Sequence, residues 1–370
     1  MVVVESTGTY WIPIHAVLEG TIELIVANAY KIKHIPGRKT DISDSEWLAE
    51  LGINGMVEPS RIFPKEDREL RMLTRAREGY VTDMTKEKNK IHYALESCGI
   101  KLSSVLADIF GKSGRYLLDS LLNGAGLEEM IEGIPVKRIK EKADQIREAV
   151  RGSLETAQII LIRGGLDQMR SIQRRIDEID KEIKDRIATT RIKEDLKIAM
   201  SIPGIGFVSA ATILAEIGDF KDFAKAEQLA AWSGLVPAVY QSADKNVTGS
   251  ITKHGSRHIS RILVEVAHAI ARTNKSRLKS FFRRVQAKKG YNVAAVALAR
   301  KVLCILHHLL MNRELYQEDD AKTKKKTTIN VNISTQRTRM DLDEMIQILV
   351  KAGYVIQKTS IRNNSFDTGG

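Results

Sequence analysis

The chain has 370 residues and is strongly basic, with 58 Lys plus Arg against 46 Asp plus Glu and a formal net charge of +12. This balance favours a polyanion such as nucleic acid as partner, while an aromatic content of only 5% argues against a single-strand binder that stacks bases on aromatic rings. The two cysteines, Cys98 and Cys304, stand far apart, which excludes ordinary zinc-ligand spacing and fits a reducing compartment.

The length leaves room for two or three domains. The first residues carry no cationic leader pattern, and no run reaches the roughly 18 uncharged apolar residues that would span a bilayer. We therefore expect a cytoplasmic protein without a membrane partner.

The chain begins with the pattern of a β-α-β unit. Residues 2–4 are a β-branched run that ends at Glu5, residues 11–18 have a helical pattern, and residues 22–27 predict a second strand. A carboxylate therefore stands at the end of the first predicted strand.

Two further carboxylates follow a basic segment. Asp41 and Asp44 are three residues apart, on one face of the start of a helix expected around residues 47–51. Together with Glu5 they could converge on Mg²⁺, which prefers oxygen ligands. Alternatively, Asp41 caps this helix and Asp44 interacts with its dipole.

The middle of the chain is predicted to be helical. A long basic helix is expected from Pro64 to Glu96, and its charges are equally typical of a solvated face. Further on, apolar residues recur at steps of three and four, as in a coiled-coil seam. The seam consists of Leu166, Met169, Ile172, Ile176, Ile179, Ile183 and Ile187. Its partner helix comes either from the same chain, for which residues 139–162 are a candidate, or from a second protomer.

A helix-hairpin-helix pattern follows the seam. Residues 196–202 are apolar at helical spacing, Pro203 ends that helix, and Gly204 and Gly206 permit a tight turn before a helix over residues 208–217. Backbone N–H groups at such a turn suit a phosphate oxygen and read no base sequence. The alternative is a plain turn between two packed helices.

Ser242 is the candidate nucleophile. Attack on a phosphodiester requires removal of the hydroxyl proton and neutralisation of the phosphate charge. Clustered cations can neutralise the phosphate charge. His254 and His258 could assist removal of the hydroxyl proton. The alternative is a capping or solvated serine in a polar loop. The cations proposed to contact DNA are Lys245, Lys253, Arg257 and Arg261.

The remaining elements are predicted to be helices joined by basic segments. A helix is expected over residues 259–271, a basic turn over residues 281–290 and an Ala-rich helix over residues 292–310. The end of the chain, residues 317–370, is predicted to be a basic flexible tail with a short helix at residues 341–353.

Several of these motifs occur together in one known family. They are I-P-G-I-G at 202–206, A-E-I-G at 215–218, W-S-G-L-V-P at 232–237, Q-S-A-D-K at 241–245, E-S-T-G-x-Y-W at 5–11 and G-R-K-T-D-x-x-D at 37–44. In this set the chain resembles the IS110 family, the Piv/MooV-like insertion-sequence transposases and DNA invertases.

The resemblance implies a catalytic assignment. In the family, the serine of the Q-S-A-D-K motif becomes covalently joined to DNA, and a RuvC-like, RNase H-type domain holds Mg²⁺ with an Asp-Glu-Asp-Asp set. The matching positions are Ser242 and, for three of the four carboxylates, Glu5, Asp41 and Asp44. The first Asp would lie on a strand upstream of Glu5, so we expect either an N-terminally truncated copy or a sequence that begins at a misplaced start codon.

The predicted architecture is α/β plus mostly α. It comprises a partial RuvC-like sheet with a trailing helix (residues 1–97), a helical linker and coiled coil (98–195), a helical C-terminal transposase domain with the helix-hairpin-helix (196–316), and the tail (317–370). The resemblance implies a DNA transposase or site-specific recombinase that is directed by a guide RNA, as many members of the family are. We expect it to act at the nucleoid of a prokaryote, as a homo-oligomer, a dimer or tetramer, that holds two DNA ends. The alternatives are a DNA-binding protein without catalysis and an inactive remnant of a transposase.

Overall fold

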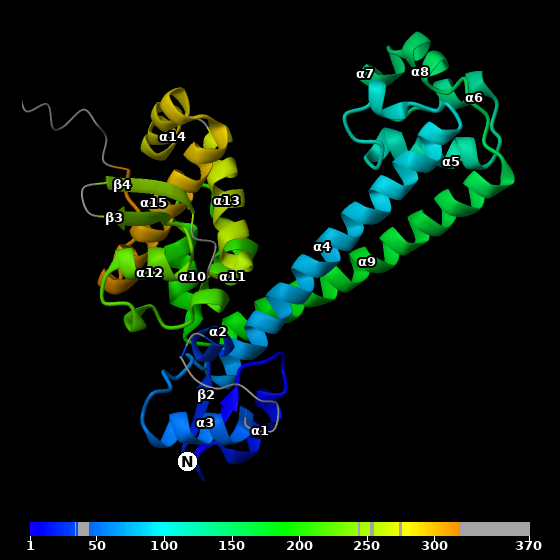
Figure 1. Cartoon of the computed structure of the whole chain (residues 1–370). Helices are drawn as coiled ribbons and strands as arrows, with labels where there is room; N and C mark the ends of the chain where they lie inside the picture. The colour runs from blue at the N-terminus through cyan, green and yellow to red at the C-terminus, as the bar shows by residue number, and fades with distance from the viewer. Residues whose placement is uncertain (34, 36–43, 243–244, 252–254, 274–275, 319–370) are drawn as a thin grey trace, which may run out of the picture. The chain divides into compact units, whose positions relative to one another are not determined.

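The computed structural model describes residues 1–33, 35, 44–242, 245–251, 255–273 and 276–318. Within these residues the protein is mostly helical, with two separate two-stranded sheets (Figure 1). The helix predicted for residues 341–353 and nearly all of the predicted tail lie outside the described residues.

The N-terminal segment forms the predicted β-α-β unit. Strands β1 (Val2–Glu5) and β2 (Leu24–Ala27) are parallel, and Glu5 is paired with Ala27. Helix α1 (Trp11–Leu18) connects them, α2 (Ala29–Lys33) follows β2, and α3 (Asp44–Ile53) packs against β1. A small core of Ala27, Leu51 and Val57 holds these elements together.

Two long helices, α4 (Lys65–Ser97) and α9 (Thr156–Thr189), lie side by side (Figure 1). Five of the seven predicted seam residues are fully buried, and ion pairs cross the two helices, such as Arg77 Nε to Asp180 Oδ1 at 2.5 Å. The seam therefore packs against α4 of the same chain. The prediction of a partner within the same chain is confirmed, but that partner is α4 and not residues 139–162, because the many charges of α4 obscured its apolar stripe in the sequence. Contact with a second protomer stays a prediction.

Four short helices cover one end of this pair. They are α5 (Lys112–Leu122), α6 (Leu127–Glu132), α7 (Lys137–Lys140) and α8 (Ala143–Ala149). Their apolar side chains share a core with Ile91 and Leu95 of α4 and with Ile162 and Met169 of α9. Apolar burial of this kind stabilises the cap without any disulfide, and Cys98 and Cys304 are both free thiols.

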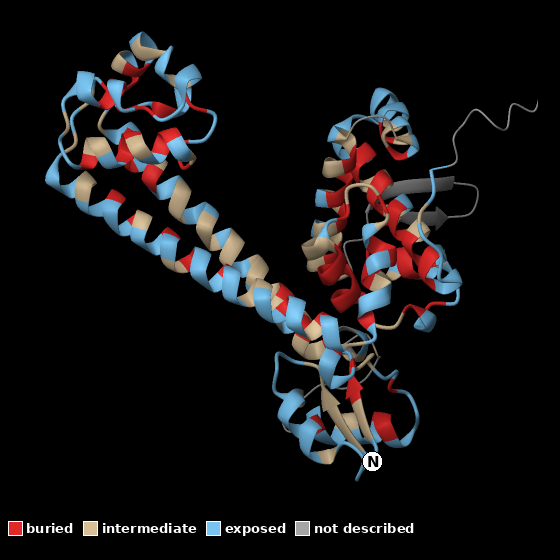
Figure 2. Cartoon of the chain, turned by 180° about the vertical axis from the view of Figure 1, so that it is seen from behind, coloured by how far each residue is buried: buried red, intermediate tan, exposed pale blue. Residues whose placement is uncertain are grey.

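The largest core belongs to the C-terminal helices, where buried residues gather most densely (Figure 2). These helices are α10 (Ile192–Met200), α11 (Phe207–Ile217), α12 (Ala226–Trp232), α13 (Arg257–Arg272), α14 (Arg277–Lys289) and α15 (Tyr291–Asn312). Among the described helices only α15 has the length and composition of a membrane span. Most of its apolar side chains, including Leu298 and Leu306 at 0% exposure, are buried in the core, and the helix contacts α12, α13 and α14.

Two local predictions for this region were wrong. Strands β3 (Pro237–Ser242) and β4 (Lys245–Ile251) form an antiparallel hairpin inside a domain predicted to be helical. The predicted basic turn at residues 281–290 is instead part of α14, because Leu278 and Phe282, one helical turn apart, are both buried. Only Gly290, with a φ of +83°, makes the turn into α15.

Candidate functional site

The hairpin places Ser242 at the end of a strand. Ser242 is the last residue of β3, and its backbone is paired with that of Lys245, the first residue of β4. Residues 243–244, which join the strands, lie outside the described residues. Ser242 and Lys245, both predicted from the sequence to contact DNA, are thus neighbours at the turn end of the hairpin.

The base of the hairpin is tightly packed. Ser233 is fully buried just before β3, and Gly255 lies directly after the segment that follows β4. A Cβ on Gly255 would come within 2.3 Å of the carbonyl carbon of Ser233, so only glycine fits there. Ser260 of α13 also donates a hydrogen bond to the Ser233 carbonyl at 2.9 Å. The chain segments on the two sides of the hairpin are therefore in close contact at Ser233 and Gly255.

The predicted tight turn joins α10 to α11, and its two glycines differ. Gly204 has a φ of +86°, and a Cβ there would lie 2.6 Å from Ile270 Cγ1 of α13. Gly206 precedes α11 with a φ of −94°, and a Cβ there would have no neighbour within 4 Å. Gly204 thus serves the packing of the turn on α13, whereas Gly206 is open to an approaching ligand.

The other predicted DNA contacts have different environments. Arg257 begins α13 and is exposed. Arg261 lies 2.6 Å from Glu78 Oε1 of α4, and His258 Nδ1 lies 2.7 Å from Glu78 Oε2. These two side chains therefore connect α13 to α4. Burial alone would raise the pKa of Glu78, but the hydrogen bonds from His258 and Arg261 hold it below its ordinary value. Lys253 and His254 lie outside the described residues.

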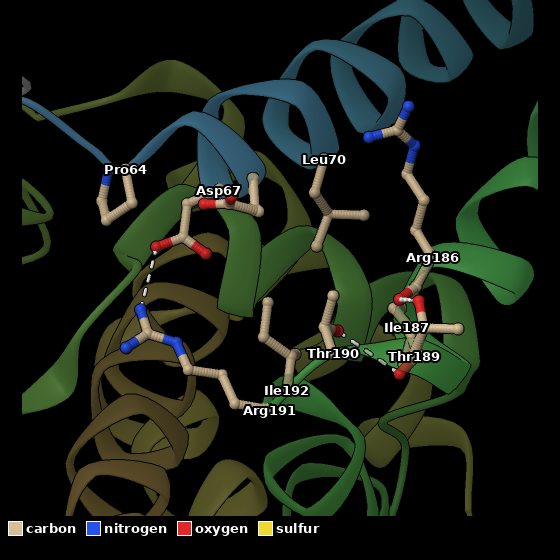
Figure 3. Close-up of a pocket in the computed structure, with 10 residues that line it drawn as sticks. Pro64, Asp67, Leu70, Arg186, Ile187, Thr189, Thr190, Arg191 and Ile192 are labelled. Carbon is tan, nitrogen blue, oxygen red and sulfur yellow. Dashed lines mark hydrogen bonds and ion pairs between the residues drawn. The ribbon is translucent and has the colours of Figure 1, made fainter.

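A cleft of about 540 Å³ lies between the start of α4 and the connection from α9 to α10 (Figure 3). Asp67, only 3% exposed, faces Arg191 across it, with Oδ2 at 3.2 Å from Nη2. Leu70, Ile187 and Ile192 supply apolar walls. Among the described residues, none that the sequence predicted to act on DNA lines this cleft.

Comparison with known proteins identifies two family regions. Residues 1–100 match the transposase family DEDD_Tnp_IS110, and residues 196–283 match the family described as transposase IS116/IS110/IS902. A probable family 20 transposase of Pseudomonas aeruginosa is 25% identical over 324 residues, which cover 86% of each chain.

The chain belongs to the IS110 family of transposases.

Other relatives match this chain over shorter stretches. The transposase for insertion sequence element IS1111A of Coxiella burnetii is 34% identical over 145 residues, 38% of this chain and 39% of that protein. A pilin gene-inverting protein of Moraxella bovis is 26% identical over 147 residues, 39% of this chain and 46% of that protein. For these two relatives, the match spans less than half of their length.

Of the three carboxylates predicted to bind Mg²⁺ in this transposase, the structure describes Glu5 and Asp44. Glu5 ends β1, and its Oε1 accepts a hydrogen bond from the Thr7 hydroxyl at 2.6 Å. Asp44 is exposed and is the first residue of α3, the helix that packs against β1. Asp41 lies outside the described residues. In the part of the chain that the structure describes, no three His, Cys, Asp or Glu side chains converge as metal ligands would.

Sequence reasoning missed one buried charge cluster in this transposase. Glu216, in the A-E-I-G motif, is 0% exposed and forms a bidentate pair with Arg75 of α4, at 2.7 and 3.0 Å. Arg71 Nη2 lies 3.1 Å from Oε2 of the same carboxylate, and the Ser256 hydroxyl donates to it at 2.8 Å. The signal in the sequence was a single Glu within the apolar helix 208–217, because a buried charge needs a partner.

The cluster keeps its charges despite burial. Burial alone would raise the pKa of Glu216, but the hydrogen bond from Arg75 and the charges of Arg71 and Arg75 outweigh it, so the pKa lies below its ordinary value. Burial lowers the pKa of Arg71, against the attraction of Glu216. An aromatic site adjoins the cluster, since Arg71 lies over the Phe63 ring at 4.4 Å.

Proposed function

We propose that this transposase cuts and rejoins DNA strands with Ser242 as the nucleophile. The observation that carries the proposal is the position of Ser242 at the turn end of the β3–β4 hairpin, beside Lys245. The hairpin lies within the region that matches the transposase family, and α13 begins nearby with the exposed Arg257. A strand end next to cationic residues suits a hydroxyl that must reach a phosphate.

The proposed reaction exchanges one phosphodiester for another. The Ser242 hydroxyl loses its proton, its oxygen bonds to the phosphorus, and the bond from phosphorus to one deoxyribose oxygen breaks. That deoxyribose oxygen takes up a proton and leaves as a hydroxyl. A hydroxyl of a second strand then attacks the phosphoserine and releases Ser242. Because the phosphate ester bond is conserved, rejoining needs no external energy source.

The proposal includes Mg²⁺ held by Glu5, Asp41 and Asp44, a cation that would stabilise developing charge at the phosphate. Support comes from Glu5 at the end of β1 and Asp44 at the start of α3, which packs against β1. These two residues alone do not make a complete ligand set. We therefore assign no step of the reaction to the metal.

DNA is proposed to contact the turn between α10 and α11. The open position of Gly206 supports this, because helix N-terminal N–H groups near it can approach a phosphate oxygen. The other residues of the proposed contact set are Gly204, Lys245, Lys253, Arg257 and Arg261. For Gly204 and Arg261 we infer an indirect contribution, since Gly204 packs on Ile270 and Arg261 is paired with Glu78.

A guide RNA and a homo-oligomer are also part of the proposal. The formal charge of +12 favours a nucleic-acid partner beyond the DNA contact itself. For the oligomer, support comes from a groove on the α4–α9 pair, where Tyr93, Ile160 and Leu161 are 76%, 65% and 66% exposed. Such apolar exposure on a helix pair is typical of a protein contact.

The test is the substitution Ser242→Ala in the full chain, purified with any nucleic acid that it carries. The substrate is a labelled duplex bearing an end of the insertion sequence that encodes the chain. We expect loss of strand transfer and of the covalent protein–DNA adduct on a denaturing gel, while the Kd for the duplex stays within about twofold. Ser250→Ala, the same substitution on the partner strand β4, is the matched control and should retain activity.

Two results would overturn the assignment of Ser242. One is an adduct that persists in Ser242→Ala, and the other is a loss of duplex binding that equals the loss of activity. If wild-type protein binds the duplex with steep salt dependence and forms no adduct, a DNA-binding role without catalysis replaces the proposal. A broad, non-cooperative unfolding transition of the wild-type chain would instead support an inactive remnant.

A further inference from the structure

Glu216 connects three segments that are far apart in the sequence. Its carboxylate accepts hydrogen bonds from Arg75 of α4 and from Ser256 at the start of α13, while Glu216 itself belongs to α11. The side chain of Glu216 is 0% exposed, so these partners replace water completely. A buried ion pair is costly to form and gains stability only when its geometry and hydrogen bonds are good. We therefore consider which residues the Glu216 cluster holds in place, and not only how much it stabilises the fold.

The Ser256 hydroxyl does not cap the helix that it precedes. Ser256 is the N-cap residue of α13, where a serine hydroxyl ordinarily accepts a hydrogen bond from a backbone N–H of the first helical turn. Here the hydroxyl makes no such cap and donates instead to Glu216 Oε2 at 2.8 Å. Ser276, the N-cap of α14, shows the ordinary arrangement, with its Oγ accepting from the Lys279 N–H at 3.0 Å.

This hydrogen bond lies at the base of the hairpin. Ser256 directly follows Gly255, which is pressed against the backbone of Ser233, four residues before the first strand of the hairpin. Ser260, one turn into α13, donates to the Ser233 carbonyl and to no residue of α4. The Ser256–Glu216 hydrogen bond therefore connects this base to Arg71 and Arg75 of α4, in addition to the contacts of His258 and Arg261 with Glu78.

We propose that Ser256 and Glu216 are positioning residues for Ser242, an inference that rests on the proposed function. Glu216, fixed by Arg71 and Arg75, holds Ser256 and with it the start of α13 and the base of the hairpin. In-line attack on phosphorus depends on placement, and a displacement of about 1 Å at a reacting group can cost about 100-fold in rate. The hydrogen bond acts on Ser242 through the backbone, without contact to DNA.

The test uses full-length protein with Ser256→Ala, which removes the hydroxyl and leaves the Glu216–arginine pairs intact. We expect kcat for strand transfer to fall about 10- to 100-fold with little change in KM. Ser256→Thr keeps a hydroxyl and should restore most of the rate. Ser276→Ala is the matched control, because it removes an ordinary cap and should leave the rate per folded molecule unchanged.

A second readout does not depend on activity. Backbone hydrogen exchange of residues 237–251 should be faster in Ser256→Ala than in wild type, with no such change in Ser276→Ala. Unchanged exchange together with an unchanged rate overturns the positioning role, and so does a rate loss that Ser256→Thr fails to restore. If wild type shows no strand transfer that depends on Ser242, the proposed function fails, and the exchange result alone decides whether the hydrogen bond orders the hairpin.

Discussion

Replacing Gly204 by alanine should destabilise the C-terminal core by about 2–4 kcal/mol. The φ of +86° puts an L-residue in the left-handed region, at a cost of about 1–2 kcal/mol. The new Cβ would lie 2.6 Å from Ile270 Cγ1 and 3.2 Å from the Ile270 backbone nitrogen. Ile270 is 0% exposed and cannot move aside freely, so overpacking by this one methyl group adds about 1–2 kcal/mol, the lower part of the usual cost.

Hydrogen exchange of the slowest amides of α13 measures this effect locally. A loss of about 2–4 kcal/mol corresponds to exchange that is about 30- to 1000-fold faster. Gly206→Ala is the matched control, because φ is −94° and the new Cβ would have no neighbour within 4 Å. It should leave exchange within about fivefold of wild type, which is about 1 kcal/mol.

The pair of variants also separates packing from DNA contact. If the turn contacts phosphate, Gly206→Ala should weaken duplex binding without loss of stability, because a methyl group then stands where the backbone is open. If the slowest amides of α13 exchange in Gly204→Ala at the same rate as in wild type, the packing argument for Gly204 is refuted. Equal acceleration in both variants would refute the distinction drawn between the two glycines.

Two further predictions concern α4 and its contacts. Ile183→Ala, in the α4–α9 interface at 1% exposure, should lower the free energy of unfolding by about 2–5 kcal/mol in urea. Ile53→Ala, the same substitution at 77% exposure and outside the groove proposed for the oligomer, should change it by less than about 0.5 kcal/mol. Equal effects would contradict the interface. Glu78 has a pKa lowered by His258 and Arg261, so its stabilising contribution is complete above about pH 4.5 and is lost as the pH falls through the lowered value. Glu78→Gln should flatten the loss of stability on this acid side, and an unchanged slope would count against the pair.

Local sequence signals were sufficient for most helices and for the β-α-β unit. The strands at residues 2–5 and 24–27, the long helix after Pro64 and the turn at Gly204 follow from periodicity, proline and glycine, because these act within a few residues of the chain. The family was also evident from short motifs. The placement of Asp41 stays a prediction, as do the roles of Ser242 and Glu5.

The sequence by itself indicated most of the longer helices and the apolar seam of α9, but it missed the helix α14 and the apolar stripe of α4. Only the tertiary structure decided which faces meet: α9 packs on α4, the segment after Pro237 pairs as a hairpin, and Glu216 finds Arg75, 141 residues away in the chain. Periodicity shows that a surface must be buried, but the choice of partner depends on complementary shapes and charges that come together only when the chain folds.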